Sequence, residues 1–296
     1  MNMMRTLLAD LKYIIIAMRP KQWIKNFFIF AGLFFSRNMS DLSLMLDVTI
    51  GFLLFCLAAS AIYIFNDIID IPRDKNHPKK SKRPLAAGKL SIIKAGLASL
   101  SLITVALTCS FSLDEKFALI LLAYSAMNIL YSIKIKQVVI LDILFIAFGF
   151  ILRVLAGVTL AGVYPSDWLI ICSMTLALFL GFTKRRQELV FQSSDTTSRS
   201  VLSEYSVSFL DQMIAVVTAC TVMSYALYTV SPETVARFHT RNLVMTVPFV
   251  LYGIFRYFYL IHKKGHGEDP TLLLLNDKPT LVNLLLWLVS VAIIIY

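Results

Sequence analysis

Residues 63–74 read Tyr63-Ile64-Phe65-Asn66-Asp67-Ile68-Ile69-Asp70-Ile71-Pro72-Arg73-Asp74, and within this stretch an apolar run ends in an amide and three carboxylates. Residues 45–65 carry one charged side chain, that of Asp47. Residues 73–89 carry seven Lys or Arg. An apolar run of about 20 residues is long enough to cross a bilayer as a helix. The stretch therefore indicates a membrane helix that ends at a strongly charged surface.

The spacing of the polar residues predicts a binding site at the end of this helix. Asn66 and Asp70 are four positions apart and would share one face of the last turn, with Asp67 on the neighbouring face. We expect Pro72 to end the helix and leave Asp74 in the loop. A hard cation such as Mg²⁺ prefers oxygen ligands and commonly bridges to substrate phosphates. The pattern therefore favours a metal and diphosphate site at a membrane surface.

The composition is that of a membrane protein. Of the 296 residues, 58% are hydrophobic, and the mean hydropathy is +0.74, well above soluble composition. We predict an all-α integral membrane protein, formed as a bundle of about nine transmembrane helices in a single domain over residues 1–296. The expected helices cover approximately residues 14–35, 45–69, 92–112, 115–132, 138–161, 167–184, 210–230, 242–262 and 280–296.

The net charge of +10 is explained by topology rather than by nucleic acid. With the N-terminus in the cytoplasm, 21 of the 28 Lys and Arg fall in cytoplasmic segments, and the outer loops hold Arg37, Lys116, Arg237 and Arg241. This asymmetry follows the positive-inside rule. No basic and aromatic ladder indicates nucleic-acid binding. We therefore expect a multi-pass membrane protein with its active site on the cytoplasmic side.

The dense polar clusters all fall on that predicted side, which favours a single pocket. They are Arg19–Lys25, Asn66–Arg83, Tyr131–Asp142 and Lys184–Glu188. The catalytic loops would cover about residues 66–91 and 184–209. Each cluster also has a plainer interpretation, because Lys and Arg commonly anchor helices or line solvated loops at a membrane surface.

Two charged residues fall within the predicted helix 138–161. Asp142 and Arg153 are 11 residues apart, almost three full turns, so they would share a face. A charge deep in a bilayer costs roughly 2.5–3.5 kcal/mol on insertion scales, so Arg153 should face the bundle interior or a wet cavity. Either a structural pair or a phosphate-binding role fits this position, and the second is favoured.

Two further pairs are spaced by four residues. Lys184 and Glu188 could form a helix-surface pair, or could supply a phosphate contact and a carboxylate that orients it. Lys21 and Lys25 would likewise share a helical face, near Arg19. This basic stripe suits either an interfacial anchor or a lipid phosphate.

The motif Asn66-Asp67-x-x-Asp70-x-x-x-Asp74 after the second of nine helices resembles the UbiA-type membrane prenyltransferase superfamily. The resemblance implies a helical bundle with a cytoplasmic active site and a lateral opening for lipid. Most members bind a prenyl diphosphate through two Asp-rich motifs. Here the second motif reads Lys184-Arg185-Arg186-Gln187-Glu188, with a cation where the first carboxylate would be.

This departure, together with several spaced motifs, is similar to the decaprenyl-phosphate phosphoribosyltransferase branch. The motifs are Arg19-Pro-Lys-Gln-Trp23-Ile-Lys-Asn26, Pro84-Leu-Ala-Ala-Gly88, Tyr131-Ser-x-x-Lys134, Gly149-Phe-x-x-Arg153-x-x-Ala-Gly157 and Lys184-Arg185-x-x-Glu188-Leu. Members of that branch transfer 5-phosphoribose from phosphoribosyl diphosphate (PRPP) to a polyprenyl phosphate and release pyrophosphate. The resemblance implies a bacterial inner-membrane enzyme of cell-wall biogenesis, which in mycobacteria serves arabinan assembly.

The resemblance also implies roles for individual residues. Mg²⁺ would be held by Asn66 and Asp70. The catalytic set would be Asp67, Asp70, Asp74 and Lys184. PRPP would be bound by Lys21, Tyr63, Lys80, Arg83, Lys134, Asp142, Arg153, Lys184 and Glu188. The lipid phosphate would be met by Arg19 and Lys25. Assembly into a homo-oligomer stays open.

The chemistry expected from these residue types is positioning and charge neutralisation. The leaving diphosphate would depart from C1 of the ribose with oxocarbenium character, and the acceptor phosphate is already an anion that needs no strong base. In-line attack would invert C1 and give a β-linked lipid. The alternatives are a UbiA-type aromatic prenyltransferase that uses a prenyl diphosphate and, from another class, a transporter.

Overall fold

The computed structural model describes residues 2–190, 200–263, 273 and 276–296. The chain forms two compact units, one made of residues 1–145, 152–164 and 192–201, the other of residues 146–151, 165–191 and 202–296. Within the described residues the regular elements are all helical, and eight helices have the length and composition to cross a membrane. The predicted all-α membrane fold is therefore confirmed.

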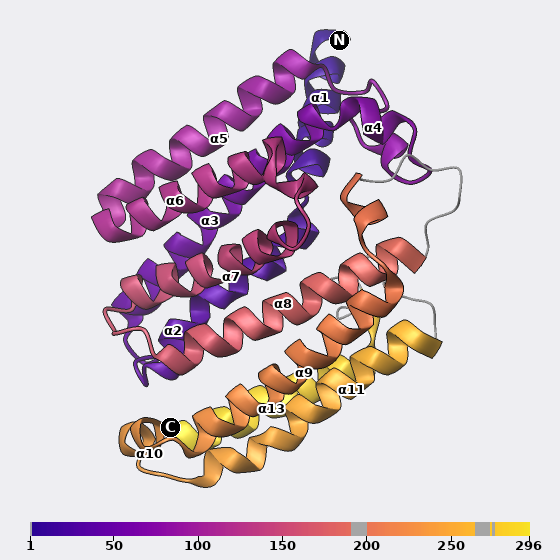
Figure 1. Cartoon of the computed structure of the whole chain (residues 1–296). Helices are drawn as coiled ribbons and strands as arrows, with labels where there is room; N and C mark the ends of the chain where they lie inside the picture. Colours follow the sequence, from indigo (N-terminus) through magenta and orange to yellow (C-terminus); the bar gives the residue numbers. More distant parts are fainter. Residues whose placement is uncertain (1, 191–199, 264–272, 274–275) are drawn as a thin grey trace. The chain divides into compact units, whose positions relative to one another are not determined.

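The first unit is built on α3 (Leu42–Ile69), which packs against α5 (Ile92–Leu113) and α6 (Glu115–Ile133) (Figure 1). Most of α7 (Leu141–Leu160) belongs to the same unit. Its apolar core includes Phe55, whose ring centroid lies 4.7 Å from that of Tyr124. The predicted bounds of these four helices are correct to within about three residues, since apolar length and N-cap residues such as Ser91 fix them locally.

Shorter elements connect these helices near the acidic motif. The connection between α3 and α5 contains α4 (Ile71–Lys75) and a 3₁₀ turn η2 (Lys80–Lys82), and η3 (Ile135–Gln137) follows α6. Asp74, expected in a loop, therefore lies in a short helix. As predicted, α3 ends shortly before Pro72. Pro72 also lies in the first turn of α4, where its missing N–H costs nothing.

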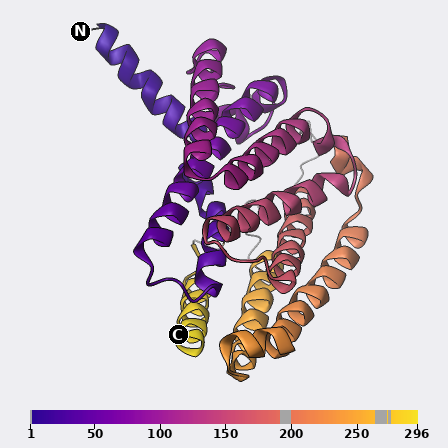
Figure 2. The same ribbon diagram turned by 90° about the vertical axis from the view of Figure 1, so that its left-hand side faces the viewer.

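The first predicted helix, residues 14–35, is not continuous. It is divided into α1 (Asn2–Met18), a ten-residue 3₁₀ helix η1 (Pro20–Ile29) and α2 (Phe30–Phe35). The joint is Arg19, whose backbone is left-handed at φ 53°. Figure 2 shows α1 running outward from this joint. A 3₁₀ run this long is uncommon, because the tighter ladder makes poorer hydrogen bonds.

Contacts with α3 measure the rise of the 3₁₀ segment. They are, in order along the chain, Arg19 with Asp67, Trp23 with Ser60, Asn26 with Cys56 and Phe30 with Phe52. The 11 steps from Arg19 to Phe30 thus run beside the 15 steps from Asp67 to Phe52 of α3. Fifteen α-helical steps extend about 22 Å at 1.5 Å per residue. The segment rises about 2 Å per residue, as a 3₁₀ helix should.

This rise makes residues 20–35 long enough to cross a bilayer. Ten 3₁₀ residues and six α-helical residues extend about 29 Å, whereas sixteen α-helical residues would extend about 24 Å. The hydrocarbon core is about 30 Å thick. The prediction of about nine crossings therefore agrees with the structure, although the first crossing is built differently from the other eight.

The described residues of the second unit form six main helical elements. They are α8 (Asp167–Val190), α9 (Val207–Val230), α10 (Pro232–Phe238), η5 (Asn242–Thr246), α11 (Val247–Lys263) and α13 (Lys278–Ile295), with a 3₁₀ turn η4 (Ser200–Glu204) before α9. The helix expected at 167–184 continues to Val190, so the charged run Lys184–Glu188 is helical. Residues 191–199 of the predicted loop 184–209 lie outside the described part of the chain.

An ion pair joins α11 to the start of α13. Arg256 donates from Nε and Nη2 to the two carboxylate oxygens of Asp277, at 3.0 and 2.9 Å. Asp277 also caps α13 by accepting from the backbone and hydroxyl of Thr280. The Arg256 guanidinium, followed by the Thr280 donors, holds the pKa of Asp277 well below its ordinary range. The pair fixes two helices of the second unit to one another.

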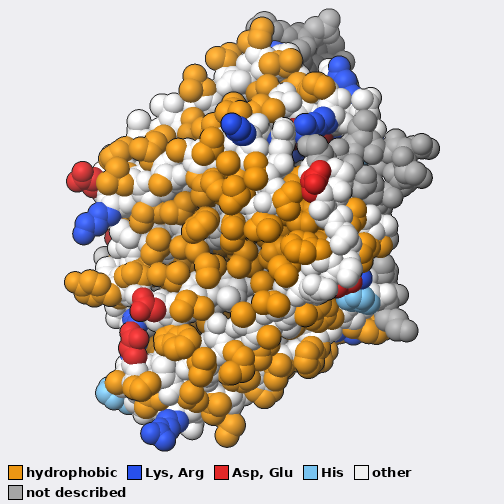
Figure 3. Space-filling view, viewed as in Figure 1, with side chains coloured by type: hydrophobic (Ala, Val, Ile, Leu, Met, Phe, Trp, Pro, Cys, Tyr) orange, Lys and Arg blue, Asp and Glu red, His pale blue; other side chains and the backbone are white. Residues whose placement is uncertain are grey.

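The outer surface is suited to lipid. The face seen in Figure 3 is predominantly hydrophobic, with charged side chains mostly toward its margins. Large apolar side chains such as Ile93, Leu97 and Ile293 are more than half exposed. Exposed apolar area of this extent is incompatible with a water-soluble monomer and is typical of helices that face hydrocarbon.

Candidate active site

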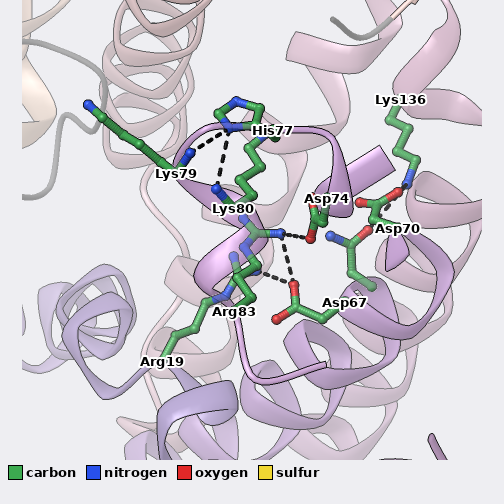
Figure 4. A network of polar contacts seen from close by, with 10 residues as sticks. Arg19, Asp67, Asp70, Asp74, His77, Lys79, Lys80, Arg83 and Lys136 are labelled. Atoms are coloured by element: carbon green, nitrogen blue, oxygen red, sulfur yellow. Dashed lines mark hydrogen bonds and ion pairs between the residues drawn. The ribbon is translucent and has the colours of Figure 1, made fainter. Parts of the chain in front are cut away.

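Asn66 and Asp70 share one cation at the end of α3. The Lys136 ammonium lies 2.6 Å from Asp70 Oδ1 and 3.4 Å from Asn66 Oδ1, and Figure 4 shows Lys136 and Asp70 pointing toward one another. The predicted turn geometry is thus present, because residues four apart on a helix place their oxygens side by side. Both oxygens are directed at the same positive charge.

Lys136 is the functional candidate that the sequence did not single out. Its side chain is 3% exposed, and η3 carries it back toward α3. Lys134, the predicted PRPP ligand, instead caps α6 with an exposed side chain. Two lysines one residue apart are equivalent in composition, so only the turn at the end of α6 distinguishes them.

Asp67 and Asp74 form a second cluster with two arginines. Arg83 Nη1 lies 3.1 Å from Asp67 Oδ1 and 2.6 Å from Asp74 Oδ2 (Figure 4). Arg19 pairs with the same Asp67 oxygen. Asp67 and Asp74 are 2% and 4% exposed. Two buried carboxylates are thereby neutralised by two partly exposed guanidinium groups, as buried charges require.

Arg19, expected at the lipid phosphate, is held at the acidic motif instead. Besides its pair with Asp67, its guanidinium carbon lies 5.0 Å from the centre of the Tyr63 ring, a cation–π arrangement. Tyr63, predicted to bind PRPP, therefore lies within the same cluster. These contacts also fix the left-handed joint between α1 and η1.

The basic loop is ordered around a histidine. His77 Nδ1 accepts hydrogen bonds from the backbone N–H groups of Lys79 and Lys80, at 3.2 and 3.3 Å (Figure 4). An accepting Nδ1 is an unprotonated one, so this ring is a structural acceptor in the turn. The turn sets the position of Lys80, a predicted PRPP ligand that is partly buried.

Arg153 does not reach this surface. Its Nε donates to Asn26 Oδ1 and its Nη2 to the Tyr124 hydroxyl, both at 2.7 Å, and the side chain is 5% exposed. Asp142 is fully buried in the first turn of α7, about 16 Å away along the helix at 1.5 Å per residue. The two residues thus lie at different depths, as their separation of 11 positions implies, and Arg153 faces the interior of the protein as predicted.

The 3₁₀ form of η1 separates Lys21 from Lys25. Positions three apart eclipse in a 3₁₀ helix, so positions four apart differ by about a third of a turn. The expectation of a shared face is therefore wrong. Lys21 is exposed, whereas Lys25 is partly buried and about 8 Å further along the helix at 2 Å per residue.

In the second unit, the end of α8 carries its own charge network. Arg185 Nη1 lies 2.6 Å from Glu188 Oε2 and is 1% exposed. Arg186 pairs with Asp211 of α9 at 2.5 Å. Lys184 is partly buried on the same turn. The predicted residues Lys184 and Glu188 thus lie one turn apart on one helix, and Arg185 is a partner of Glu188 that the spacing did not predict.

Comparison with known proteins identifies the family. The model of the UbiA prenyltransferase family matches residues 26–276. The chain belongs to the UbiA prenyltransferase family. The predicted resemblance is confirmed, and membership in a family of transferases argues against the transporter alternative.

Sequence relatives of this UbiA-family chain include phosphoribosyltransferases. The decaprenyl-phosphate phosphoribosyltransferase of Corynebacterium glutamicum is 31% identical over 95% of this chain and 86% of that protein. The enzyme of the same name from Mycolicibacterium smegmatis is 29% identical over 95% and 91%. The uncharacterized protein y4nM of Sinorhizobium fredii is 32% identical over 88% of this chain, which spans only 52% of its length.

Solved UbiA structures share the fold. A UbiA homologue from Archaeoglobus fulgidus bound to GPP and Mg²⁺ superimposes with a TM-score of 0.73 at 18% identity, over 96% of this chain and 99% of that one. The same protein bound to DMAPP and Mg²⁺ gives 0.70 at 19% identity, over 94% and 97%. At this identity the likeness establishes the fold of the UbiA-family chain and leaves its substrates open.

The donor set of this UbiA-family site fits a metal held jointly with substrate. Among the described residues, no three His, Cys, Asp or Glu side chains converge as a metal site. Asn66 and Asp70 nevertheless present two hard oxygens that already share one cation, the Lys136 ammonium. Mg²⁺ is usually bound through one or two carboxylates together with phosphate oxygens and water. These two residues suit that manner of binding.

Proposed function

We propose that this protein transfers 5-phosphoribose from PRPP to a polyprenyl phosphate such as decaprenyl phosphate, releases pyrophosphate and requires Mg²⁺. The names of the relatives and their coverage support the substrate pair. The proposal further places the protein in a bacterial inner membrane with a cytoplasmic N-terminus. Polyprenyl phosphate and PRPP are its proposed partners, and a homo-oligomer stays open.

The observation that carries the proposal is the alternation of anions and cations around the end of α3. Asp70 and Asn66 face Lys136, and Asp67 and Asp74 face Arg83. Lys136 balances the charge of Asp70, so it can transfer to a phosphate without leaving a large net charge once a metal takes its place at Asp70 and Asn66. An arrangement of this kind suits a metal–diphosphate substrate better than an uncharged one.

The excess of cations favours PRPP over a prenyl diphosphate. PRPP carries a 5-phosphate in addition to its diphosphate, and the acceptor brings another phosphate. In the first unit the proposed contacts of PRPP are Lys80, Arg83 and Lys136, with Lys21 on η1, and Lys25 is the proposed contact of the lipid phosphate. In the second unit the proposed contacts are Lys184 and Glu188, at a position where most family members are expected to carry an Asp-rich motif.

The residues would act by positioning and by charge. Bound Mg²⁺ would neutralise the diphosphate and improve it as a leaving group, held by Asn66 and Asp70. Lys136 and Lys80 would donate to the diphosphate as its bond to C1 breaks and negative charge grows on the leaving oxygen. A phosphate oxygen of the lipid forms the new bond to C1 from the opposite face. The ribose is therefore inverted, and the product is β-linked.

The proposal is tested with purified protein in detergent, Mg²⁺, PRPP labelled in the ribose and decaprenyl phosphate. Label should enter the lipid phase, and it should be lost with EDTA or in Asp70→Asn. Asp10→Asn is the matched control, because Asp10 pairs with Lys94 at an exposed site away from the cluster. Retained label in Asp70→Asn would contradict the proposed metal site. A product with retained α configuration would contradict the in-line mechanism.

A second candidate is transfer of a prenyl group to an aromatic acceptor. It is the alternative predicted from the sequence, and the Archaeoglobus fulgidus homologue of the same fold binds GPP, a prenyl diphosphate. In the same assay, consumption of a prenyl diphosphate with an aromatic acid, and no use of PRPP, would decide for this candidate.

A further inference from the structure

Asn26 is the buried polar residue at the centre of the 3₁₀ segment. It is 1% exposed, its amide oxygen accepts from Arg153 Nε at 2.7 Å, and its amide nitrogen donates to Cys56 Sγ at 3.2 Å. Thiol sulfur is a weak acceptor, so the bond from Arg153 is the strong one. An amide at this depth that lost its partners would have no water to replace them.

That pairing is compatible with the 3₁₀ form and incompatible with an α-helix. Each 3₁₀ residue turns about 120°, against about 100° in an α-helix. Six residues after Pro20, an α-helix would direct Asn26 about 120° away from its present direction, and about 3 Å short of its present depth. The Asn26–Arg153 bond would then be broken.

Arg153 itself is held from two other sides. Its guanidinium donates to the Tyr124 hydroxyl and lies 4.7 Å from the Tyr124 ring centre and 5.8 Å from that of Phe55. Both rings belong to the core between α3 and α6. The guanidinium is thus held by the core side chains Tyr124 and Phe55, and Asn26 of η1 accepts a hydrogen bond from it.

A close backbone contact supports the same register independently. A Cβ on Gly157 of α7 would lie 1.8 Å from the carbonyl oxygen of Ile29, the last residue of η1. Only glycine admits this approach. Gly157 and Arg153 are four positions apart on α7, so one face of that helix fixes both Asn26 and Ile29.

We propose that Arg153 is a positioning residue that, through Asn26, holds the first membrane span in its 3₁₀ form and thereby sets the depth and direction of Lys25. Arg153 in this proposal contacts no substrate. The α-helical alternative would draw the end of η1 back by about 5 Å and would bring Lys21 and Lys25 toward one face.

The link to catalysis rests on the proposed function. With Lys21 and Lys25 on different faces, each lysine addresses a different phosphate, in keeping with Lys21 for PRPP and Lys25 for the lipid. Loss of the 3₁₀ form would move Lys25 relative to the acidic motif. Misplacement of about 1 Å can lower a rate on the order of 100-fold, so the effect on turnover would be large.

The register is tested without reference to activity. In protein whose four cysteines are replaced by serine, a short flexible bifunctional thiol reagent should cross-link Phe30→Cys to Phe52→Cys, because the two side chains meet in the structure, with ring centres 5.5 Å apart. The cross-link should be lost in Asn26→Leu and in Arg153→Met. It should persist in Asn26→Asp, which still accepts from Arg153, and in Tyr124→Phe, which removes only the bond from Arg153 to the Tyr124 hydroxyl.

Two further results keep the test decisive. A cross-link between Ala61→Cys and Ser99→Cys reports on α3 against α5, where Ser99 Oγ donates to the Ala61 carbonyl, and should form in every variant. If Arg153→Met loses this control cross-link as well, the variant no longer packs α3 against α5. The proposal is then tested by comparing the Phe30–Phe52 cross-link in Asn26→Leu with that in Asn26→Asp. A Phe30–Phe52 cross-link that survives Asn26→Leu overturns the proposal.

Kinetics then separate positioning from direct binding. If Arg153 acts through Asn26 to position Lys25, then Arg153→Met and Asn26→Leu both raise KM for the lipid phosphate. The double variant then has the same KM as either single variant. If Arg153 is a PRPP ligand, Arg153→Met alone raises KM for PRPP, and the proposal is overturned. Failure of the proposed reaction would leave the cross-linking result unaffected.

Discussion

The ammonium of Lys136 lies 2.6 Å from the carboxylate of Asp70, although the two residues are 66 positions apart. This lysine stands where a metal would approach Asp70 and Asn66. We expect Lys136→Met to lower kcat/KM for PRPP on the order of 100-fold, because a charge-assisted donor to the leaving group is lost. The same change at Lys134, which is exposed, should cost less. If Lys134→Met lowers kcat/KM for PRPP as much as Lys136→Met or more, Lys134 is the PRPP ligand, as predicted from the sequence.

The same contact predicts how metal binds without substrate. While Lys136 occupies the two oxygens, Mg²⁺ should bind weakly in the absence of PRPP, since metal and ammonium compete for one site. Lys136→Met should strengthen binding of Mg²⁺ or Mn²⁺ to the free protein, measured by calorimetry or by the spin resonance of Mn²⁺. Adding Asp70→Asn to this variant should abolish the gain, and unchanged affinity would show that the lysine and the metal use separate sites.

Arg83 should contribute to stability as well as to binding. It neutralises two buried carboxylates but is itself 25% exposed, so its loss should cost about 1–3 kcal/mol, between the values for exposed and buried pairs. We expect Arg83→Met to lower Tm in detergent. Arg73→Met, on the exposed side of α4, serves as the control and should leave Tm nearly unchanged. Equal shifts would mean that Asp67 and Asp74 are stabilised by other groups.

The contact between α7 and η1 predicts a glycine requirement. Gly157→Ala would place a methyl group against the Ile29 carbonyl, and we expect a loss of about 1–3 kcal/mol or more from overpacking. Gly96→Ala in α5 meets nothing within 4 Å and should stabilise its helix by about 0.5–1 kcal/mol. Thermal unfolding of the two variants should move in opposite directions. A tolerated Gly157→Ala would indicate that η1 and α7 are further apart.

The Arg256–Asp277 pair predicts a pH-independent contribution near neutrality. Because the pKa of Asp277 is held below its ordinary value of 3.8, the pair stabilises the protein above that pH and loses its effect only as the pH falls below it. Asp277→Asn should therefore lower Tm by a similar amount at about pH 5.5 and about pH 8. A difference that disappears by pH 5.5 would contradict the lowered pKa.

Sequence was sufficient for the elements that local chemistry determines. Apolar length located the membrane helices, and the spacing of Asn66 and Asp70 correctly placed both oxygens on one face. It was insufficient where distant contacts decide. Nothing in residues 20–29 distinguishes a 3₁₀ helix from an α-helix until Arg153 meets Asn26. Likewise, Lys136 differs from Lys134 only through the turn that buries it, and Asp74 lies in the short helix α4, where its carboxylate pairs with Arg83 nine positions further along the chain.

The 3₁₀ crossing determines on which sides of the membrane the two ends of the chain lie. Counted with the eight long helices of the described residues, residues 20–35 bring the crossings to nine, an odd number. Asn2 and Tyr296 would then face opposite compartments. Reporter enzymes fused at either end should give opposite signals, whereas a search for α-helical spans alone would assign both ends to one side.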